Sequence, residues 1–592
     1  MTGKLLIGGL LALAFAAPAA AAPTTLMPGV TYERGVQFTP HGPVAIHVVR
    51  GPRPTGLYAL RPVLSNETIE GTERVTSMQK RLSPSATMVG VNGDFFAASG
   101  RPSGVLMRGG VVDSPPFGDR SSLGVAPEGA LDVRRIEFFG TWRGLGQRRT
   151  LNDLNQFPGP NGISLFTSTY GPATPAGGGT TEAVIFPLPP TTPNTDLTGP
   201  VIQVAGAGGT PIPQGGAVLV ARGTAAARLA EEAVVGTNLT LRLIFRPEWT
   251  GITEAVGGGP VLVRTGGPVF RAQEAFTSSQ LAPRNPRTAV GQLADGRILM
   301  VVTDGRRPGY SVGMTNFELA QTLVRLGAVT GSALDGGGSS TLAFDGSLLN
   351  RPSDSGGERP AANALQLMYY GVYAPAPDAV ISPNGDGVAE QQRQLSYKVV
   401  RPSTVTATLV APGEVPAFTE TVSRPPGTYP VAFPPAPANP LAVPAAPAEG
   451  RWRLDVTATD DLGRRSAISQ PFTVNSTLGF AKLSRRSLVV RVRGTQTIQA
   501  GATLTRAARV TATVETSSGV QVATLAIRRA EAGRFVSTWR GTTRGGRSLV
   551  YDGTYVIRFR AANELGTVDL VSAPFRVIRA APVPVKKPKS KG

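Results

Sequence analysis

The sequence predicts a mixed α+β (α/β) domain followed by two all-β sandwiches. Residues 23–375 combine many short β-like runs with a few helix-like segments. Residues 376–475 and 476–578 instead contain strand-length alternating segments and almost no helical periodicity. The 592 residues include 72 Gly and 52 Pro, a composition that favours turns and short strands over long helices.

The first 22 residues have the pattern of a secretory signal peptide. Lys4 supplies the positive charge, residues 5–15 form an apolar run, and Ala-rich residues 18–22 offer small-x-small cleavage positions. The alternative is an N-terminal membrane anchor, but the run is shorter than the roughly 20 residues of a bilayer span. The sequence therefore predicts a secreted or cell-envelope-associated protein with no transmembrane span after signal removal.

Composition restricts the chemistry that the chain can perform. It has no cysteine, which excludes Zn–thiolate, Cys-nucleophile and redox chemistry and, in an exported chain of this size, favours a bacterial origin. It has two histidines, His41 and His47, both near the N-terminus. Acid–base chemistry is therefore expected to depend mainly on carboxylates.

The formal net charge is +20, which is compatible with a nucleic-acid partner. Such a partner would require aromatic platforms interleaved with Lys and Arg, but aromatic residues make up only 6% of the chain and are not so arranged. The export pattern also argues against nucleic acid. We expect anionic cell-envelope polymers as partners instead. Residues 579–592, which end in VKKPKSKG, are expected to form a disordered basic tail.

Three apolar strand-like runs end at carboxylates. TMVGVNGDFF (residues 87–96) contains Asn92 and Asp94, GRILMVVTDGR (296–306) contains Asp304, and GSALDGGGSS (331–340) contains Asp335. These three aspartates are the candidate catalytic residues, because paired carboxylates are what glycosyl transfer needs: one acid for the leaving group and a base or nucleophile opposite.

A helix is predicted between the second and third of these runs. In TNFELAQTLVRLG, Thr315 and Glu318 have capping-box spacing, and Gly327 is a good C-terminal stop. Residues 296–335 thus resemble a strand–helix–strand unit. If the two strands are parallel, Asp304 and Asp335 face one crevice at the same sheet edge.

The glycines that follow Asp335 suggest an anion site. Glycine lets backbone N–H groups approach a ligand closely, and successive N–H groups form a nest for an anion. The alternative is a Gly-rich hairpin turn. Arg287, Arg359 and Asn363 lie in flanking segments, and a guanidinium can hold a phosphate with two hydrogen bonds, although each could equally be an ordinary surface residue. The nest comprises Gly336, Gly337, Gly338, Ser339 and Ser340.

Together these motifs resemble the phosphodiester glycosidase family, whose namesake is N-acetylglucosamine-1-phosphodiester α-N-acetylglucosaminidase and whose bacterial relatives include exopolysaccharide-associated proteins. The resemblance covers roughly residues 30–375. It rests on NPRTAVG, TDGR followed by SVGMTNFELAQTLVRLG, ALDGGGSSTL and RPSDSGGERPAANAL in this order, with GVNGDFF and GGGPVLVRTG before them.

The resemblance implies an exported hydrolase that removes a sugar from a sugar-1-phosphodiester and leaves a phosphomonoester. It implies that Asn92 and Asp94 line the sugar site, that Arg287 and the nest hold phosphate, and that Asp304 and Asp335 lie nearest the chemistry. The substrate would be an N-acetylglucosamine-1-phosphodiester or a phosphorylated surface glycan, and no cofactor is expected. The alternative is a non-catalytic glycan-binding surface protein.

The C-terminal part contains an internal repeat. GRWRLDVTATDDLGRRSAISQPFTV (residues 450–474) aligns without a gap with GTYVIRFRAANELGTVDLVSAPFRV (553–577), which predicts two tandem Ig-like sandwiches. ISPNGDGVAE (381–390) resembles the entry of Ig-like domains of the flagellar hook-capping type. Its Asn384 and Asp386 match part of a calcium loop, but the pattern is too short for a full loop and favours a plain turn.

Overall fold

The computed structural model describes residues 23–269, 273–384, 395–436, 446–491, 496–543 and 550–580. The predicted signal peptide, Asp386 and almost all of the basic tail lie outside these ranges. The chain divides into two compact units, Met1–Tyr370 and Gly371–Gly592, and each is described by itself below.

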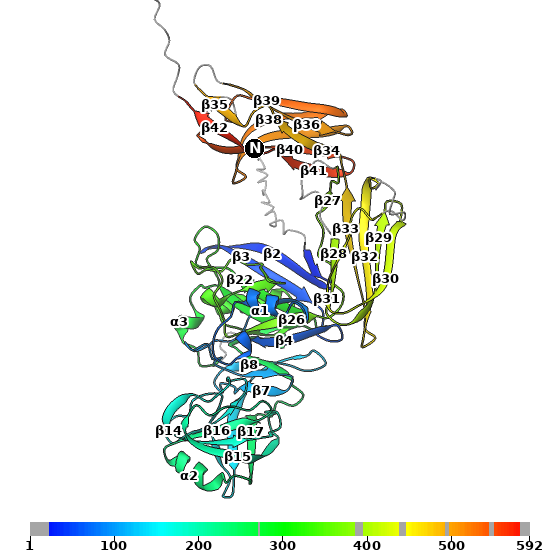
Figure 1. The fold of residues 1–592 in the computed structure, drawn as a ribbon. Helices are drawn as coiled ribbons and strands as arrows, with labels where there is room; N and C mark the ends of the chain where they lie inside the picture. The colour runs from blue at the N-terminus through cyan, green and yellow to red at the C-terminus, as the bar shows by residue number, and fades with distance from the viewer. Residues whose placement is uncertain are drawn as a thin grey trace, which may run out of the picture. The chain divides into compact units, whose positions relative to one another are not determined.

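The fold is nearly all β, so the prediction of a mixed α+β domain is wrong. Within the described ranges there are four α-helices: α1 (Val75–Leu82), α2 (Thr224–Glu232), α3 (Ser278–Leu281) and α4 (Asn316–Arg325). The prediction fails because it generalised from one clearly marked helix, α4, to the whole domain. The many short apolar runs around it pair with one another, mostly as antiparallel strands (Figure 1).

An eight-stranded sheet carries two of the three candidate aspartates. Its order is β1-β2-β3-β22-β21-β23-β19-β20, and all of its pairings are antiparallel. The strands are β1 (Thr24–Met27), β2 (Val30–Thr39), β3 (Gly42–Gly51), β19 (Val261–Arg264), β20 (Gly267–Pro268), β21 (Arg287–Leu293), β22 (Ile298–Thr303) and β23 (Ala328–Ala333).

The strand–helix–strand segment is present, but its two strands are not neighbours. Strands β22 and β23 each pair antiparallel with β21, which lies between them. They therefore run in the same direction and end at the same edge, with α4 connecting them across β21. An intervening strand separates their ends by two strand spacings, roughly 10 Å.

Helix α4 forms where the sequence predicts it. The Thr315 hydroxyl accepts the Glu318 N–H, the Glu318 carboxylate accepts the Thr315 N–H, and Gly327 follows the helix with a φ of +94°. The apolar face of the helix packs on the eight-stranded sheet, where Leu319 and Leu323 join a buried cluster with Ala289, Leu299 and Val301. Burial of this stripe covers the part of the sheet formed by β19, β20, β21 and β23.

A five-stranded sheet, β25-β24-β5-β26-β4, carries Asn92 at the end of β5. Helix α1 covers it, with Val75 and Met78 packed on Met88 and Ala364. The two sheets approach closely: a Cβ added to Gly51 of β3 would lie 2.3 Å from the Leu367 side chain of β26, which would have to shift. The strands are β4 (Tyr58–Leu64), β5 (Thr87–Asn92), β24 (Leu342–Phe344), β25 (Ser347–Leu348) and β26 (Asn363–Tyr369).

Two further sheets complete the first unit. One has the order β7-β6-β18-β8-β9, from β6 (Leu106–Arg108), β7 (Val111–Ser114), β8 (Ser121–Val125), β9 (Leu131–Arg135) and β18 (Glu254–Gly257). The other has the order β11-β10-β17-β15-β14-β16-β13-β12. It comprises β10 (Glu137–Arg143), β11 (Arg149–Leu151), β12 (Asp153–Leu154), β13 (Ile163–Thr167), β14 (Ala176–Ile185), β15 (Asp196–Gly208), β16 (Ala217–Arg222) and β17 (Asn238–Arg246).

The second unit contains two separate apolar cores, each enclosed by a pair of sheets. The first core combines strands of β27-β33-β32-β29-β30 with those of β28-β31. The second combines strands of β34-β36-β39 with those of the sheet built from β35-β42-β40-β37-β38, in which β41 pairs with β40. That the sandwiches are Ig-like stays a prediction.

The internal repeat recurs in these two sheet pairs. In the first, β32 (Gly450–Asp460) and β33 (Arg465–Val474) are antiparallel, and the short β27 (Val380–Ile381) adds parallel to β33. In the second, β40 (Gly553–Asn563) pairs with β41 (Gly566–Val571) and with β42 (Phe575–Arg579), and β35 (Ser487–Val490) adds parallel to β42. The remaining strands are β28 (Leu395–Val399), β29 (Ser403–Ala411), β30 (Val415–Arg424), β31 (Gly427–Val431), β34 (Leu478–Leu483), β36 (Ile498–Leu504), β37 (Ala508–Thr516), β38 (Gln521–Ala530) and β39 (Gly533–Trp539).

Candidate active site

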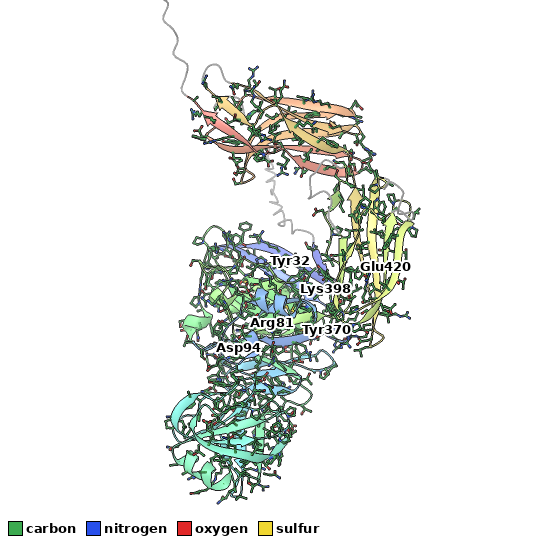
Figure 2. The ribbon with its side chains drawn as sticks, in the orientation of Figure 1. Tyr32, Arg81, Asp94, Tyr370, Lys398 and Glu420 are labelled. Carbon is green, nitrogen blue, oxygen red and sulfur yellow. The ribbon has the colours of Figure 1, made fainter. Side chains whose placement is uncertain are left out.

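Asp94 is a buried carboxylate held by backbone N–H groups. One of its oxygens accepts the Phe95 N–H at 2.8 Å and the other accepts the Gly104 N–H at 2.6 Å. A Cβ added to Gly257 would lie 2.3 Å from the second oxygen, so the backbone approaches as closely as only glycine allows. Burial raises the pKa of Asp94 to about 7, and the nearby charge of Asp335 adds to this shift. Figure 2 labels Asp94 in the N-terminal unit.

Asp335 is the neighbour of Asp94. The Asp335 N–H donates to the Gly93 carbonyl at 3.0 Å, which ties the end of β23 to the turn after β5. Burial raises the pKa of the Asp335 carboxyl to about 6, while Ser339 and Arg359 oppose the shift. The Ser339 hydroxyl lies beside this carboxyl without completing a hydrogen bond of good geometry. Asp335 is partly exposed whereas Asp94 is buried, so Asp335 is the more accessible of the two.

Asn92 joins the two sheets beneath this pair. Its amide N–H donates to the Asp335 carbonyl at 2.7 Å, and its side-chain oxygen accepts the Thr288 hydroxyl at 2.8 Å and the Thr341 N–H at 3.0 Å. The residue is fully buried. These contacts tie Asn92 to β21 and to both ends of the glycine turn; that Asn92 lines a sugar site stays a prediction.

The glycine turn after Asp335 lies under two guanidinium groups. A Cβ added to Gly338 would lie 2.1 Å from Nη2 of Arg359, and one added to Gly337 would lie 2.9 Å from Nη2 of Arg306. Arg359 also pairs with Asp354 at 2.8 Å, and Arg306 donates to Asn285 at 3.0 Å. Both arginines are exposed, and the charge of Arg359 acts on Asp335.

Several buried polar groups around the turn have no partner within the described residues. Asn363 accepts the Asp94 N–H at 2.8 Å through its side-chain oxygen, but its amide nitrogen makes no hydrogen bond. The hydroxyls of Ser340 and Thr341 are likewise unsatisfied. Buried donors without partners are costly, and they are what a polar ligand would satisfy.

Arg287 lies in the same region, but four of the five N–H groups of its guanidinium are already used. Its guanidinium donates to the carbonyls of Gln280, Leu281, Pro283 and Met314 at 2.8–3.3 Å, and the residue is buried. Burial and the nearby charge of Arg306 lower its pKa to about 10. The arrangement anchors the segment around α3 and does not match the predicted phosphate contact.

Asp304 belongs to a different cluster from Asp335. One of its oxygens contacts His47 Nε2 at 2.9 Å and accepts the Tyr310 hydroxyl at 2.7 Å, and the other accepts the Asn350 amide and the Arg351 N–H at 3.1 and 3.0 Å. Burial alone would raise the pKa of Asp304. The hydrogen-bond partners, of which His47 has the strongest effect, hold this pKa below its usual value. Asp335 is not among these partners of Asp304, whereas its charge acts on the pKa of Asp94; that Asp304 takes part in the chemistry stays a prediction.

The residues around Asp304 were missed because their contact depends on strand pairing. His47 on β3 lies opposite Val302 on β22, two residues before Asp304, and the Tyr32 hydroxyl contacts the other ring nitrogen of His47 at 2.8 Å. Nothing in the local sequence of β3 marks His47 as a carboxylate partner. The scarcity of histidine suggested that carboxylates act without it.

Arg120 is a further cation near the carboxylate pair that sequence analysis missed. Its guanidinium lies over the rings of Phe276 and Phe95, 4.5 and 5.1 Å from their centroids. Its charge lowers the pKa of both Asp94 and Asp335, which places it within electrostatic reach of both. Beside it lies a cleft of about 420 Å³, lined by residues that include Arg101, Ser103 and Phe117.

Within the described ranges, no group of three or more His, Asp or Glu side chains is arranged to hold a metal ion. None of the helices there has the length and hydropathy needed to cross a bilayer.

Residues 197–368 match a protein-family model described as phosphodiester glycosidase. A crystal structure of a hypothetical protein from Synechocystis has a TM-score of 0.50 and 26% identity, covering 60% of this chain and 64% of that one. The zebrafish N-acetylglucosamine-1-phosphodiester α-N-acetylglucosaminidase catalytic domain, auto-inhibited by its pro-peptide, has a TM-score of 0.32 and 13% identity over 59% of this chain and 85% of that one.

A curated relative is the SPbeta prophage-derived uncharacterized protein YomE of Bacillus subtilis (strain 168), which is 34% identical over 99 residues. This stretch is 17% of the chain and 15% of the relative's length, so the match is local. The family match contains Asp304, Asp335 and Arg359, whereas Asp94 lies before it. Over residues 197–368 the chain is therefore similar to the phosphodiester glycosidase family.

Proposed function

We propose that the protein is an exported glycosidase that hydrolyses a sugar-1-phosphodiester, cleaving the glycosidic bond between the sugar and the phosphate. The observation that carries this proposal is the pair Asp94 and Asp335, two adjoining carboxyls with raised pKa values beside a turn under two guanidinium groups. The family match supports hydrolysis of phosphodiesters in general. Export rests on the signal-peptide pattern of the first 22 residues.

The two carboxyls differ in ways that suggest different roles. Asp335 is more accessible and has the lower pKa, so we assign it as the base that activates water or as the nucleophile at the anomeric carbon. Asp94 has the higher pKa and is assigned as the group that holds a proton during the reaction. Separate environments that give two carboxyls unequal pKa values are a common basis for such a division.

The phosphate is assigned to Arg359 and Arg306 in place of Arg287. Their guanidinium groups lie against the Gly337 and Gly338 backbone, and both side chains are open to solvent. Asn363 is fully buried and its side-chain oxygen accepts the Asp94 N–H, so it is assigned as a positioning residue of the carboxylate pair.

The proposal is tested by product identification. We expect the purified protein to convert a synthetic N-acetylglucosamine-1-phosphodiester into free sugar and a phosphomonoester, as measured by mass spectrometry and phosphate NMR. A panel with other sugars and both anomers would define the preferred substrate. Release of sugar phosphate and free alcohol would assign phosphodiesterase chemistry instead. Binding without turnover of any member would favour the non-catalytic glycan-binding alternative.

The two arginines that the sequence singled out are expected to behave differently. Arg359→Gln should raise KM about tenfold, because one charge-assisted contact to phosphate is lost, with little change in stability since its partner Asp354 is partly exposed. Arg287→Gln should lower the free energy of unfolding by about 2–3 kcal/mol, because buried carbonyls lose their donor. Steady-state kinetics and urea unfolding measure both. A KM effect confined to the Arg287 variant would contradict the assignment.

A further inference from the structure

Three arginines extend the positive surface beyond the proposed catalytic site. Arg34 comes from β2, Arg307 from the loop between β22 and α4, and Arg351 from the loop after β25. We call these three residues the outer arginines. Arg34 and Arg351 are exposed and Arg307 is half-buried. They come from parts of the chain that only the fold brings together.

Tyr310 is the centre of this cluster. The guanidinium of Arg351 lies 5.3 Å from its ring centroid and that of Arg34 lies 5.7 Å from it. The Tyr310 hydroxyl donates to the buried Asp304 carboxylate at 2.7 Å, which fixes the ring between β2 and the loop after β22. The ring therefore helps to hold two exposed cations in place through cation–π contacts.

The outer arginines are continuous with the proposed phosphate site. Arg307 follows Arg306, whose guanidinium lies on Gly337, and Arg307 donates to the Pro352 carbonyl at 2.8 Å. Asn350 donates to both the Ser340 carbonyl and Asp304 at 3.0 and 3.1 Å, so the segment that carries Arg351 is tied to the turn that follows Asp335. A chain of direct contacts thus connects the two surfaces.

Arg50 on the adjacent strand β3 is neutralised by Glu33, but the outer arginines are not neutralised. None of them forms an ion pair with a carboxylate of the described residues. Nε of Arg307 is also buried without a partner in this part of the chain. Arg306, which leads into the cluster, has a left-handed φ of +58°, a conformation that costs free energy in a non-glycine residue.

On the basis of the proposed function, we infer that the outer arginines bind a second phosphate, and hence that the substrate is a chain of sugars joined by repeated phosphodiesters. The scissile phosphodiester would lie on the turn under Arg306 and Arg359, and the next phosphate of the chain would lie at Arg34 and Arg351. A substrate with one phosphodiester needs no cations there. Guanidinium groups suit a phosphate because they offer paired N–H donors to its oxygens.

The test compares binding and turnover of two synthetic substrates. One is an oligomer of four sugars joined by phosphodiesters, and the other is its single-unit counterpart with one phosphodiester. The variant R34Q/R351Q removes two charges and keeps polar side chains. The matched control R143Q/R228Q removes two exposed charges from β10 and α2 of the same unit. Binding is measured by calorimetry at low and at high salt, in wild type and in each variant.

We expect R34Q/R351Q to weaken binding of the oligomer about tenfold or more at low salt, with a smaller salt dependence, and to leave the single-unit substrate unchanged. The control should bind both as wild type does. Equal losses in the two double variants would indicate general electrostatic attraction and would overturn the inference, as would unchanged binding by R34Q/R351Q. Equal binding of polygalacturonate, which carries carboxylates and no phosphate, would also overturn it.

The test of the second-phosphate site can be distinguished from the test of the proposed hydrolysis. Binding experiments test the second-phosphate site, and sugar-release assays test the hydrolysis. Selective loss of oligomer binding in a protein that releases no sugar would refute the proposed hydrolysis and would support the second-phosphate site. Sugar release, together with unchanged oligomer binding by R34Q/R351Q, would support the proposed hydrolysis and refute the second-phosphate site.

Discussion

Replacing Asp335 with Asn is expected to lower kcat for a sugar-1-phosphodiester by roughly 10³-fold or more, because the base or nucleophile is lost while the turn that holds phosphate remains. KM should change little, since Asn has the same shape and the contacts of Arg306 and Arg359 with Gly337 and Gly338 do not involve the carboxyl. The measurement is the initial rate of sugar release at saturating substrate.

Asp304→Asn is the informative comparison for this variant. Asp304 contacts His47 and Tyr310 and accepts two further N–H groups, so its loss should act mainly on stability and on the position of the loop that carries Arg306. If Asp304→Asn reduced kcat as strongly as Asp335→Asn in a protein of unchanged unfolding midpoint, the pairing of Asp335 with Asp94 would be the wrong assignment.

Replacing Asp94 with Asn is expected to lower kcat by roughly 10²-fold, a smaller loss than at Asp335. The reason is chemical: a phosphate leaving group is a weak base and needs less help from an acid than an alcohol does. The variant should also unfold more easily, by about 1–3 kcal/mol, because both Asp94 oxygens accept backbone N–H groups and an amide can accept only one of them. Urea unfolding at the assay pH verifies that the folded state still predominates.

The pH dependence of kcat separates the two carboxyls. In the wild type, activity should fall below about pH 6 as Asp335 becomes protonated, and above about pH 7 as Asp94 loses its proton. Because the two carboxyls interact, the apparent pKa values of the two limbs are properties of the pair. Asp94→Asn should remove the alkaline limb and keep the acidic one. A wild-type profile that stays flat well above pH 7 would contradict the role given to Asp94.

Stability should respond to pH through the same group. Because burial raises the pKa of Asp94 above the value 3.8 of an exposed aspartate, its contribution to stability is complete below that value and is lost as the pH rises through about 7. The wild type should therefore lose stability over this interval, and Asp94→Asn should lose less. Thermal unfolding in a pH series measures the difference.

Local patterns predicted some elements of the fold well and others poorly. The capping box at Thr315 and Glu318 and the glycine at 327 predicted α4 correctly, because helix ends depend on side chains a few residues apart. The class of the first domain was predicted wrongly, since strand pairing joins segments far apart: β3 pairs with β22, and β5 with β24 and β26. The strand β21 between β22 and β23 could not be foreseen from the spacing of Asp304 and Asp335.

The candidate site shows the same division. Asp94, Asp335 and the glycine turn could be named from the sequence because each follows an apolar strand-like run, and Asn363 because it lies in the segment after the third run. Their partners could not. Arg306 and Arg359 lie on the turn because glycines leave room for them, whereas Arg287, equally prominent in the sequence, is enclosed by four carbonyls.

Composition and local motifs were enough to establish which chemistry the chain can use: no thiols, two histidines, many arginines, and aspartates at the ends of apolar runs beside a glycine turn. These properties need no long-range contact. Other features emerge only in the folded chain. Asp335 comes near Asp94, His47 contacts Asp304, and only some of the arginines keep free donors. They depend on the pairing and packing of sheets, which bring together residues far apart in the sequence, such as His47 and Asp304 with their separation of 257 positions.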